Sequence, residues 1–295
     1  MPGIPFTKMS GVGNDFIIVD NRAGVLHGMD LSEFARRVCT RRMSLGGDQV
    51  MVIELPTSGG DFSMRTINVD GAEVNMCGNA SRCVARYAHL RGIAGEKMTI
   101  DTPGGPVVAS VAGEQVRVKL QLTSQVAMDQ TLLVGGDSYV IHTVQVSGTP
   151  HAVLYMADAA GASGEAIRRL GAAVRHHADF PQGINVNFVQ VMDRHTLWQR
   201  TFERGVEGET LACGTGAIAS AVITALRGQV DSPVLLYVLG GELDVSFERR
   251  GDGFGELSLG GGARFVAEGV LHPEAWSWPG PGRFSRPTSV AAATP

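Results

Sequence analysis

Two cysteines that stand in the same sequence context are the residues best suited to do chemistry in this chain. Cys77 and Cys213 are each followed by glycine, and a glutamate, Glu73 or Glu209, precedes each cysteine by four residues. Both segments end in Leu-Arg-Gly, and the two cysteines are 136 residues apart (77 to 213). This repetition indicates that the chain is built from two halves of like design.

Each cysteine is expected at the point where a strand gives way to a helix. The first backbone N–H groups of a helix are unpaired and its dipole is positive there, so a thiolate is stabilised and an anion can be held. Gly78 and Gly214 allow close approach of the backbone, while Asn79 and Thr215 add side-chain hydrogen bonds. We therefore expect each helix end to hold a substrate carboxylate beside its thiol.

Two thiols brought face to face by such a duplication have the geometry that inversion of a carbon centre needs. Removing a proton from one face and delivering another to the opposite face requires an acid and a base on both sides. The three lysines, Lys8, Lys97 and Lys119, do not stand beside a glycine-rich phosphate cradle, so no pyridoxal cofactor is expected. These features predict an amino-acid racemase or epimerase without cofactor or metal, in which helix ends and hydrogen bonds stabilise the carbanion.

Other chemistry-bearing residues have structural interpretations beside functional ones. Cys39 and Cys83 are expected to be small buried apolar residues, because neither shares the repeated context and no paired C-x-x-C spacing suggests zinc. His151 is interpreted equally well as a turn residue and as a functional one. Arg204 could pair with Glu203 at the surface, although its place just before the second cysteine element favours binding of a carboxylate.

Composition excludes several classes of protein. The chain has 295 residues, 44% of them hydrophobic, and a formal net charge of −4 without any Lys/Arg run. Such a chain suits two domains and a small-molecule ligand, not a nucleic acid or an anionic membrane. The longest apolar stretch, 217–226, is far shorter than the ~20 residues that span a bilayer, and no secretory signal is recognised. We expect a cytoplasmic enzyme; its oligomeric state is left open, with a homodimer as one option.

The expected elements are mostly strands, and the fold class is α+β with two similar halves. Each half should be a sheet around or against the helix that starts next to its cysteine. The expected helices are 31–40, 80–91, 164–176 and 216–227, and the expected strands are 16–19, 50–54, 62–68, 97–101, 107–111, 116–122, 138–146, 152–156, 185–191, 196–203, 234–239, 243–248 and 256–259. The Pro- and Ala-rich stretch 273–295 is expected to be a surface tail.

Six segments together resemble the diaminopimelate epimerase family. They are Lys8-Met-Ser-Gly-Val-Gly-Asn-Asp-Phe16, Gly46-Gly-Asp-Gln49, Asn68 to Asn79, Gly148-Thr-Pro-His151, Gly183-Ile-Asn185 and Phe202 to Gly216. The resemblance implies two pseudo-symmetric domains, each a mainly antiparallel, barrel-like sheet around a central helix. Their implied ranges are 1–125 and 126–263, with a last strand near 264–272 that returns to the first domain.

The resemblance also implies roles for single residues. Cys77 and Cys213 would be the proton donor and acceptor, and His151 and Glu203 would assist proton movement at the thiols. The implied substrate-binding residues are Asn14, Gln49, Asn68, Gly78, Asn79, Thr149, Asn185, Arg204, Gly214 and Thr215. The implied reaction is the conversion of LL- to meso-diaminopimelate, a step toward lysine and peptidoglycan precursors.

Two departures from the family's pattern bear on substrate choice. Thr149 stands where the family usually has asparagine, and a hydroxyl replaces only part of an amide's hydrogen bonding. Ala80 stands where glycine is usual, which affects the backbone beside Cys77. A racemase for another amino acid, such as histidine or O-ureidoserine, is therefore the alternative function, and a thiol redox or binding module is a third hypothesis.

Overall fold

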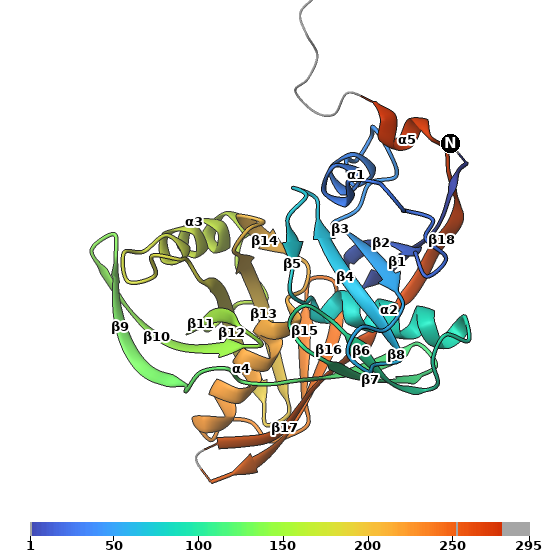
Figure 1. The fold of residues 1–295 in the computed structure, drawn as a ribbon. Coiled ribbons are helices and arrows are strands. Elements are labelled where there is room, and N and C mark those ends of the chain that lie inside the picture. Colours follow the sequence, from blue (N-terminus) through green and yellow to red (C-terminus); the bar gives the residue numbers. More distant parts are fainter. Residues whose placement is uncertain (1, 252, 279–295) are drawn as a thin grey trace, which may run out of the picture.

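A computed structural model describes residues 2–251 and 253–278 of the chain. Figure 1 shows two lobes, one coloured blue to teal and the other green to orange, with the last strand, β18, lying beside the first lobe. All strands belong to one connected sheet system. Within the described residues, no helix is both long enough and apolar enough to cross a membrane.

The first lobe follows the expected sequence of elements closely. It contains β1 (Ile4–Gly11), β2 (Asn14–Asp20), α1 (Leu31–Val38), β3 (Gln49–Glu54), β4 (Phe62–Asn68), β5 (Glu73–Val74), α2 (Gly78–Leu90), β6 (Lys97–Asp101), β7 (Val107–Ala112) and β8 (Gln115–Leu120). Strands β1 and β5 were not among the expected elements.

The second lobe repeats this order of elements. It contains β9 (Ala127–Val134), β10 (Asp137–Val146), β11 (Thr149–Tyr155), α3 (Gly164–Arg175), β12 (Asn185–Asp193), β13 (Thr196–Glu203), β14 (Gly208–Thr210), α4 (Gly214–Leu226), β15 (Val234–Val238), β16 (Gly241–Arg250) and β17 (Gly253–Gly262), and is followed by β18 (Arg264–Leu271) and α5 (Glu274–Ser277). Here β9 and β14 were not expected.

Strand pairing confirms that the two lobes share one design. In the first lobe β2 and β3 are parallel on either side of α1, β3 and β4 are antiparallel, and β4 and β6 are parallel. In the second lobe the same three relationships join β11 with β12, β12 with β13, and β13 with β15. The fold is therefore the expected α+β arrangement of two similar, mainly antiparallel sheets.

The lobes are joined through their strands as well as through the chain. Strand β18 pairs antiparallel with β1, from Leu271 opposite Ile4 to Arg264 opposite Ser10. Strand β9 pairs in the same way with β10, and β17 pairs with β8 across the lobes. The C-terminal strand thus completes the N-terminal sheet, whereas the domain limit near residue 125 stays a prediction.

Helices α2 and α4 form the centre of the molecule. Helix α4 is apolar on all sides, and every residue from Ala217 to Ala225 is buried, as expected of a helix surrounded by protein. Strands of its own lobe pack around each helix, and the two helices also touch each other. Buried residues of both helices belong to one continuous apolar core. A rigid centre of this kind fixes the positions of the two helix N-termini.

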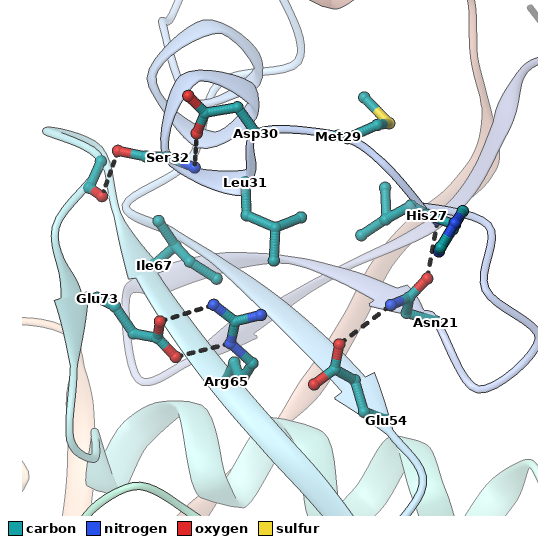
Figure 2. A pocket seen from close by; sticks show the side chains of 12 residues that line it. Asn21, His27, Met29, Asp30, Leu31, Ser32, Glu54, Arg65, Ile67 and Glu73 are labelled. Carbon is teal, nitrogen blue, oxygen red and sulfur yellow. Dashed lines mark hydrogen bonds and ion pairs between the residues drawn. The ribbon is translucent and has the colours of Figure 1, made fainter.

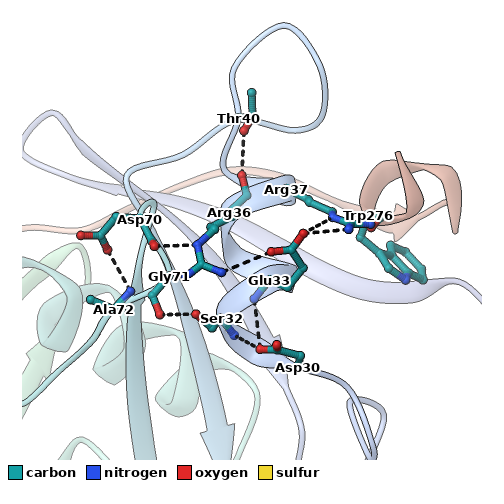
Figure 3. Close-up of polar contacts among 10 residues, drawn as sticks. All are labelled: Asp30, Ser32, Glu33, Arg36, Arg37, Thr40, Asp70, Gly71, Ala72 and Trp276. Carbon is teal, nitrogen blue, oxygen red and sulfur yellow. Dashed lines mark hydrogen bonds and ion pairs between the residues drawn. The ribbon is translucent and has the colours of Figure 1, made fainter. Parts of the chain in front are cut away.

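Helix α1 is tied to the loop after β4 by polar contacts at its start. The Asp30 carboxylate caps the helix by accepting hydrogen bonds from the backbone N–H groups of Ser32 and Glu33. The Ser32 hydroxyl donates to the Gly71 carbonyl oxygen at 2.7 Å, and Arg36 donates to the carbonyl of Asp70 (Figure 3). These contacts hold the turn that leads toward β5 and α2.

The expectation of a surface tail from residue 273 is wrong for residues 273–278. The side chain of Trp276 in α5 is only 8% exposed and lies edge-on to Phe34 of α1, with ring centroids 6.0 Å apart. Arg37 donates a hydrogen bond to the Trp276 carbonyl oxygen (Figure 3). The burial of a large aromatic ring stabilises a helix too short to show periodicity in the sequence. Residues 279–295 of the expected tail lie outside the described residues.

Candidate active site

Cys77 and Cys213 occupy equivalent positions at the starts of α2 and α4. Each is the N-cap residue of its helix, with φ and ψ of −134° and 119° for Cys77 and −125° and 109° for Cys213. The carbonyl oxygen of each accepts the first helical hydrogen bond at 2.9 Å, from Ser81 and Ala217. Both thiols are therefore held by regular elements of structure and not by loops.

The two helix N-termini meet. Asn79, in the first turn of α2, donates a hydrogen bond from Nδ2 to the carbonyl oxygen of Ala212, 3.3 Å away and directly before Cys213. A Cβ at Gly214 would lie 2.6 Å from Leu259 Cδ2 and 3.1 Å from Asn79 Oδ1, so a larger residue there would displace both side chains. Two positive helix ends thus converge on one place, which favours an anion there.

Burial controls the ionisation of both thiols. It raises the pKa of Cys77 to about 11, against the opposing effect of the backbone N–H groups of Ala80 and Asn79. Burial also raises the pKa of Cys213, which is 5% exposed, although Gly216 N–H and the Thr215 hydroxyl oppose the shift. A negative charge on Cys77 raises the pKa of Cys213 further. The thiols are therefore electrostatically coupled, and ionisation of one opposes ionisation of the other.

The carboxyl group of Glu203 lies within the electrostatic reach of both thiols. Its negative charge raises the pKa of Cys77 and of Cys213. Burial in turn raises the pKa of Glu203 to about 6. A carboxyl group that titrates so near neutral pH is suited to accept and return protons.

His151 is linked to Cys213 through Thr215. Its Nε2 lies 2.9 Å from Thr215 Oγ1, which in turn lies 3.7 Å from Cys213 Sγ. The ring is completely buried, and burial followed by the positive charge of Arg204 lowers the pKa of His151 to about 3. The imidazole is therefore neutral over the physiological pH range, and it hydrogen-bonds a residue of the site.

Three of the predicted binding residues lie on the first lobe. Asn14 donates to Asp48 Oδ2 at 2.6 Å and accepts from Asn79 Nδ2 at 3.4 Å. Gln49 and Asn68 face each other on β3 and β4, and Gln49 Nε2 donates to Asn68 Oδ1 at 2.7 Å. Asn14 is thereby connected to the α2 terminus, whereas Gln49 and Asn68 form a separate pair in the described part of the chain.

Two further predicted binding residues, Asn185 and Arg204, lie next to each other on the second lobe. Asn185 lies opposite His151 in the parallel pairing of β11 with β12, and its Oδ1 accepts from the backbone N–H of Arg204 at 2.7 Å. Among the described ion pairs none joins Arg204 to Glu203, so the surface pairing considered from the sequence is not formed. Thr149 begins β11, and no side-chain hydrogen bond is recorded for it among the described residues.

Arg82, a completely buried arginine on α2, is not among the site residues predicted from the sequence. Its Nη2 donates to Asn79 Oδ1 at 3.0 Å, while Nε and Nη1 have no hydrogen-bond partner in the described part of the chain. Its charge lowers the pKa of Cys77 in opposition to burial. The repeat contained the signal, because Arg82 stands where the second half has the apolar Ile218.

The described ranges hold no candidate metal site, and a cavity beside α1 lies apart from the two cysteines. No three His, Cys, Asp or Glu side chains there come together as a metal site. A cavity of about 430 Å³ lies beside α1 on the first lobe, but its ionic groups are already paired, Arg65 with Glu73, and Asn21 is hydrogen-bonded to Glu54 (Figure 2). None of the predicted site residues lines that cavity.

The match to a family model accords with this geometry. The model described as "Diaminopimelate epimerase" matches residues 6–128 and 143–266, which include both cysteine elements. The chain belongs to the diaminopimelate epimerase family.

Relatives in the diaminopimelate epimerase family resemble the chain over nearly its whole length. A protein of Aquifex aeolicus named diaminopimelate epimerase is 39% identical over 280 residues, covering 91% of this chain and 98% of its own. Proteins of the same name from Pseudomonas entomophila and Methanothermobacter thermautotrophicus are 37% and 33% identical and also have 98% of their lengths covered.

Solved structures extend the likeness of fold beyond the diaminopimelate epimerase family. A phenazine biosynthesis protein of the PhzF family from Bacillus anthracis superposes with a TM-score of 0.71 at 14% identity, over 92% of this chain and all of that one. A hydroxyproline epimerase from Agrobacterium vitis superposes with a TM-score of 0.67 at 14% identity, over 94% and 96%. These likenesses confirm the expected two-lobed fold.

Proposed function

We propose that this chain is an isomerase that converts LL-diaminopimelate to meso-diaminopimelate by a two-base mechanism without a cofactor. The observation that carries the proposal is the convergence of two equivalent helix N-termini, each capped by a cysteine. Relatives at 33–39% identity that bear the name diaminopimelate epimerase support the choice of substrate.

The two thiols together account for every proton in the proposed reaction. A thiolate at one cysteine takes the α-proton from one face of the substrate, and the electron pair stays on the carbon as a carbanion. The thiol at the other cysteine then delivers its proton to the opposite face and becomes the thiolate. The enzyme ends with the proton moved from one sulfur to the other, so turnover in the reverse direction starts from the product state.

The carboxylate of the reacting centre is proposed to bind between the helix ends. Gly78, Asn79, Gly214 and Thr215 supply backbone N–H groups there, and the converging dipoles stabilise the added charge of the carbanion. The buried charge of Arg82 lies beside Cys77 and Asn79 and would favour the same anion. A bound carboxylate would therefore place its negative charge close to the buried Arg82 guanidinium and the two helix N-termini.

The far end of the substrate is proposed to bind to amide and guanidinium groups that the two lobes contribute. Gln49 and Asn68 on the first lobe, and Asn185 and Arg204 on the second, could hold an amino-acid group. Thr149 offers one hydroxyl where the family usually has an amide, so it can make fewer hydrogen bonds to the distal amino-acid group of the substrate. A racemase for another amino acid is therefore the second candidate function.

Exchange of the α-proton in heavy water tests the proposal. With LL-diaminopimelate, we expect deuterium to enter the α-position while meso product accumulates; histidine and O-ureidoserine serve as comparison substrates. If one of these amino acids exchanges its α-proton and diaminopimelate does not, the chain is a racemase for that amino acid. Loss of turnover under strong reductant would instead support a redox role of the thiols.

A further inference from the structure

The two cysteine elements have nearly the same backbone conformation, but their side chains have different polar partners. In the first turn of α2, Asn79 is held by Arg82, whereas the equivalent Thr215 of α4 is held by His151. The second nitrogen of that imidazole, Nδ1, lies 3.2 Å from Nδ2 of Asn187 on β12. Asn187 is completely buried and does not belong to the residues predicted from the sequence.

The orientation of the Asn187 amide follows from its other contacts. Gln199 Nε2 donates to Thr201 Oγ1 at 3.2 Å, so the hydroxyl hydrogen of Thr201 is directed to Asn187 Oδ1, 3.0 Å away. On its other side Asn187 Nδ2 lies 3.1 Å from the carbonyl oxygen of Ala152, which only accepts. The amide oxygen therefore faces Thr201 and the NH2 group faces both Ala152 and His151.

This orientation determines the tautomer of His151. One N–H of Asn187 points to the Ala152 carbonyl, and the second points to Nδ1 of the imidazole, which must accept it. The single proton of the neutral ring then lies on Nε2, which donates to Thr215 Oγ1. Because the Thr215 oxygen already accepts from the imidazole, its own hydrogen is directed to the nearby Cys213 sulfur.

We propose that Asn187 is a positioning residue for the reaction: it holds His151 as the Nε2–H tautomer, so that Thr215 donates its hydroxyl hydrogen to Cys213 Sγ. The donated hydrogen bond stabilises the thiolate that Cys213 becomes after it has protonated the substrate. The role assigned here rests on the proposed two-cysteine mechanism, whereas the hydrogen-bond directions rest on the geometry alone.

The surroundings of Asn187 show that the network is specific to the second lobe. A Cβ at Gly216, in the first turn of α4, would lie 2.3 Å from Asn187 Oδ1, so the glycine leaves the space that the amide fills. The corresponding strand of the first lobe, β3, carries the apolar Met51 in the matching register. The hydrogen-bond chain from Asn187 through His151 and Thr215 therefore ends at Cys213. Met51 cannot start such a chain toward Cys77, so the reactivity of Cys77 can be compared with that of Cys213 in the same molecule.

Two measurements without substrate test the proposal. Nitrogen-15 NMR of histidine-labelled protein should show His151 with an unprotonated Nδ1 and a protonated Nε2 at neutral pH. In the Asn187→Leu variant, the rate of alkylation of Cys213 by iodoacetamide at pH 9, followed by peptide mass spectrometry, should fall about tenfold. The rate at Cys77 in the same molecules should stay within about twofold.

Thr201→Val provides the matched control, because it removes a hydrogen bond to Asn187 and leaves the bond to His151. It should keep the alkylation rate of Cys213 within about threefold. A protonated Nδ1 in the unmodified protein would overturn the proposal, as would equal slowing at both cysteines or an equal effect of Thr201→Val. The NMR spectrum decides even where Asn187→Leu fails to fold. Because neither measurement uses diaminopimelate, failure of the proposed substrate would not alter either result.

Discussion

Cys77 and Cys213 have nearly the same backbone conformation at the starts of two helices, with φ values of −134° and −125°, yet their polar neighbours differ. Near Cys77, Arg82 donates a hydrogen bond to Asn79 in the first turn of α2. At Cys213, the thiol contacts the Thr215 hydroxyl, which is in turn hydrogen-bonded to His151. The duplication thus supplies two like positions for proton transfer, while the differing neighbours allow each thiol to be stabilised separately.

Replacing either site cysteine should abolish epimerisation without unfolding the protein. Cys77→Ala or Cys213→Ala removes one of the two groups that exchange protons with the α-carbon, and loss of such a group typically costs about 10²- to 10⁴-fold in rate. Turnover of LL-diaminopimelate and the circular dichroism spectrum should be measured together. Cys39→Ala is the control, because Cys39 is 1% exposed in a separate apolar cluster and should leave the rate unchanged. Retained turnover in either site variant would contradict the two-base mechanism.

The equivalent glycines Gly214 and Gly78 should respond differently to alanine. A Cβ at Gly214 would lie 2.6 Å from Leu259 Cδ2 of β17 and 3.1 Å from Asn79 Oδ1 of α2, so Gly214→Ala forces these two side chains to shift at a cost of about 2 kcal/mol. A Cβ at Gly78 would lie 3.5 Å from Leu259 Cδ2, an ordinary contact, and its effect should stay within about 0.5 kcal/mol. Chemical denaturation of both variants measures the difference. Equal destabilisation would show that the Leu259 side chain moves aside at no measurable cost.

Arg82→Met should reduce activity while leaving stability unchanged or higher. The buried guanidinium has two nitrogens without a partner among the described residues, so an apolar side chain of similar length removes a desolvated charge. The same change removes the charge that lowers the pKa of Cys77, and kcat/KM should fall at least about tenfold. Thermal unfolding and kinetics check the two effects, with Arg86→Met as a control on the same helix. A large loss of stability with normal kinetics would refute this role.

His151 should make the protein less stable in mild acid. Its pKa is about 3 in the folded protein, where burial opposes the charge, and 6.5 in its unperturbed form. Between these values the unfolded chain binds a proton that the folded protein does not, so the free energy of unfolding falls as the pH drops through this window. In His151→Gln the decline between about pH 6.5 and 4.5 should be shallower. Urea denaturation across this range measures the slopes, and parallel slopes would contradict the assigned pKa.

Trp276→Ala should destabilise the protein by about 3 kcal/mol, because it leaves an unfilled space against Phe34 and loosens α5. The site lies elsewhere, so kcat/KM at low temperature should remain unchanged. Urea denaturation measures the loss of stability. Tryptophan at position 278, whose side chain is partly exposed, offers a control of the same residue type. An equal effect of Trp278→Ala would show that the docking of Trp276 contributes little.

Much of the architecture could be read from the sequence, because duplication leaves local signals. The repeated Cys-Gly elements predicted both site helices, which begin two residues before the expected starts, at Gly78 and Gly214. Alternating and β-branched stretches located β4, β6 and β13 at their observed bounds. Strands β1 and β9 were not predicted from the sequence, because they are stabilised by pairing with β18 and β10, which local residue patterns do not show.

The sequence by itself determined the family, the two thiols and the polar residues around them, since residue type and spacing record the chemistry that each element can perform. Only the tertiary structure decided which partner serves which thiol. Asn187 beside His151 and Trp276 against α1 depend on contacts between segments distant along the chain. The Arg82 contact with Asn79 is local, but the complete burial of Arg82 depends on the strands packed around α2. Hydrogen-bond direction and burial are properties of such contacts, and no local pattern of residues encodes them.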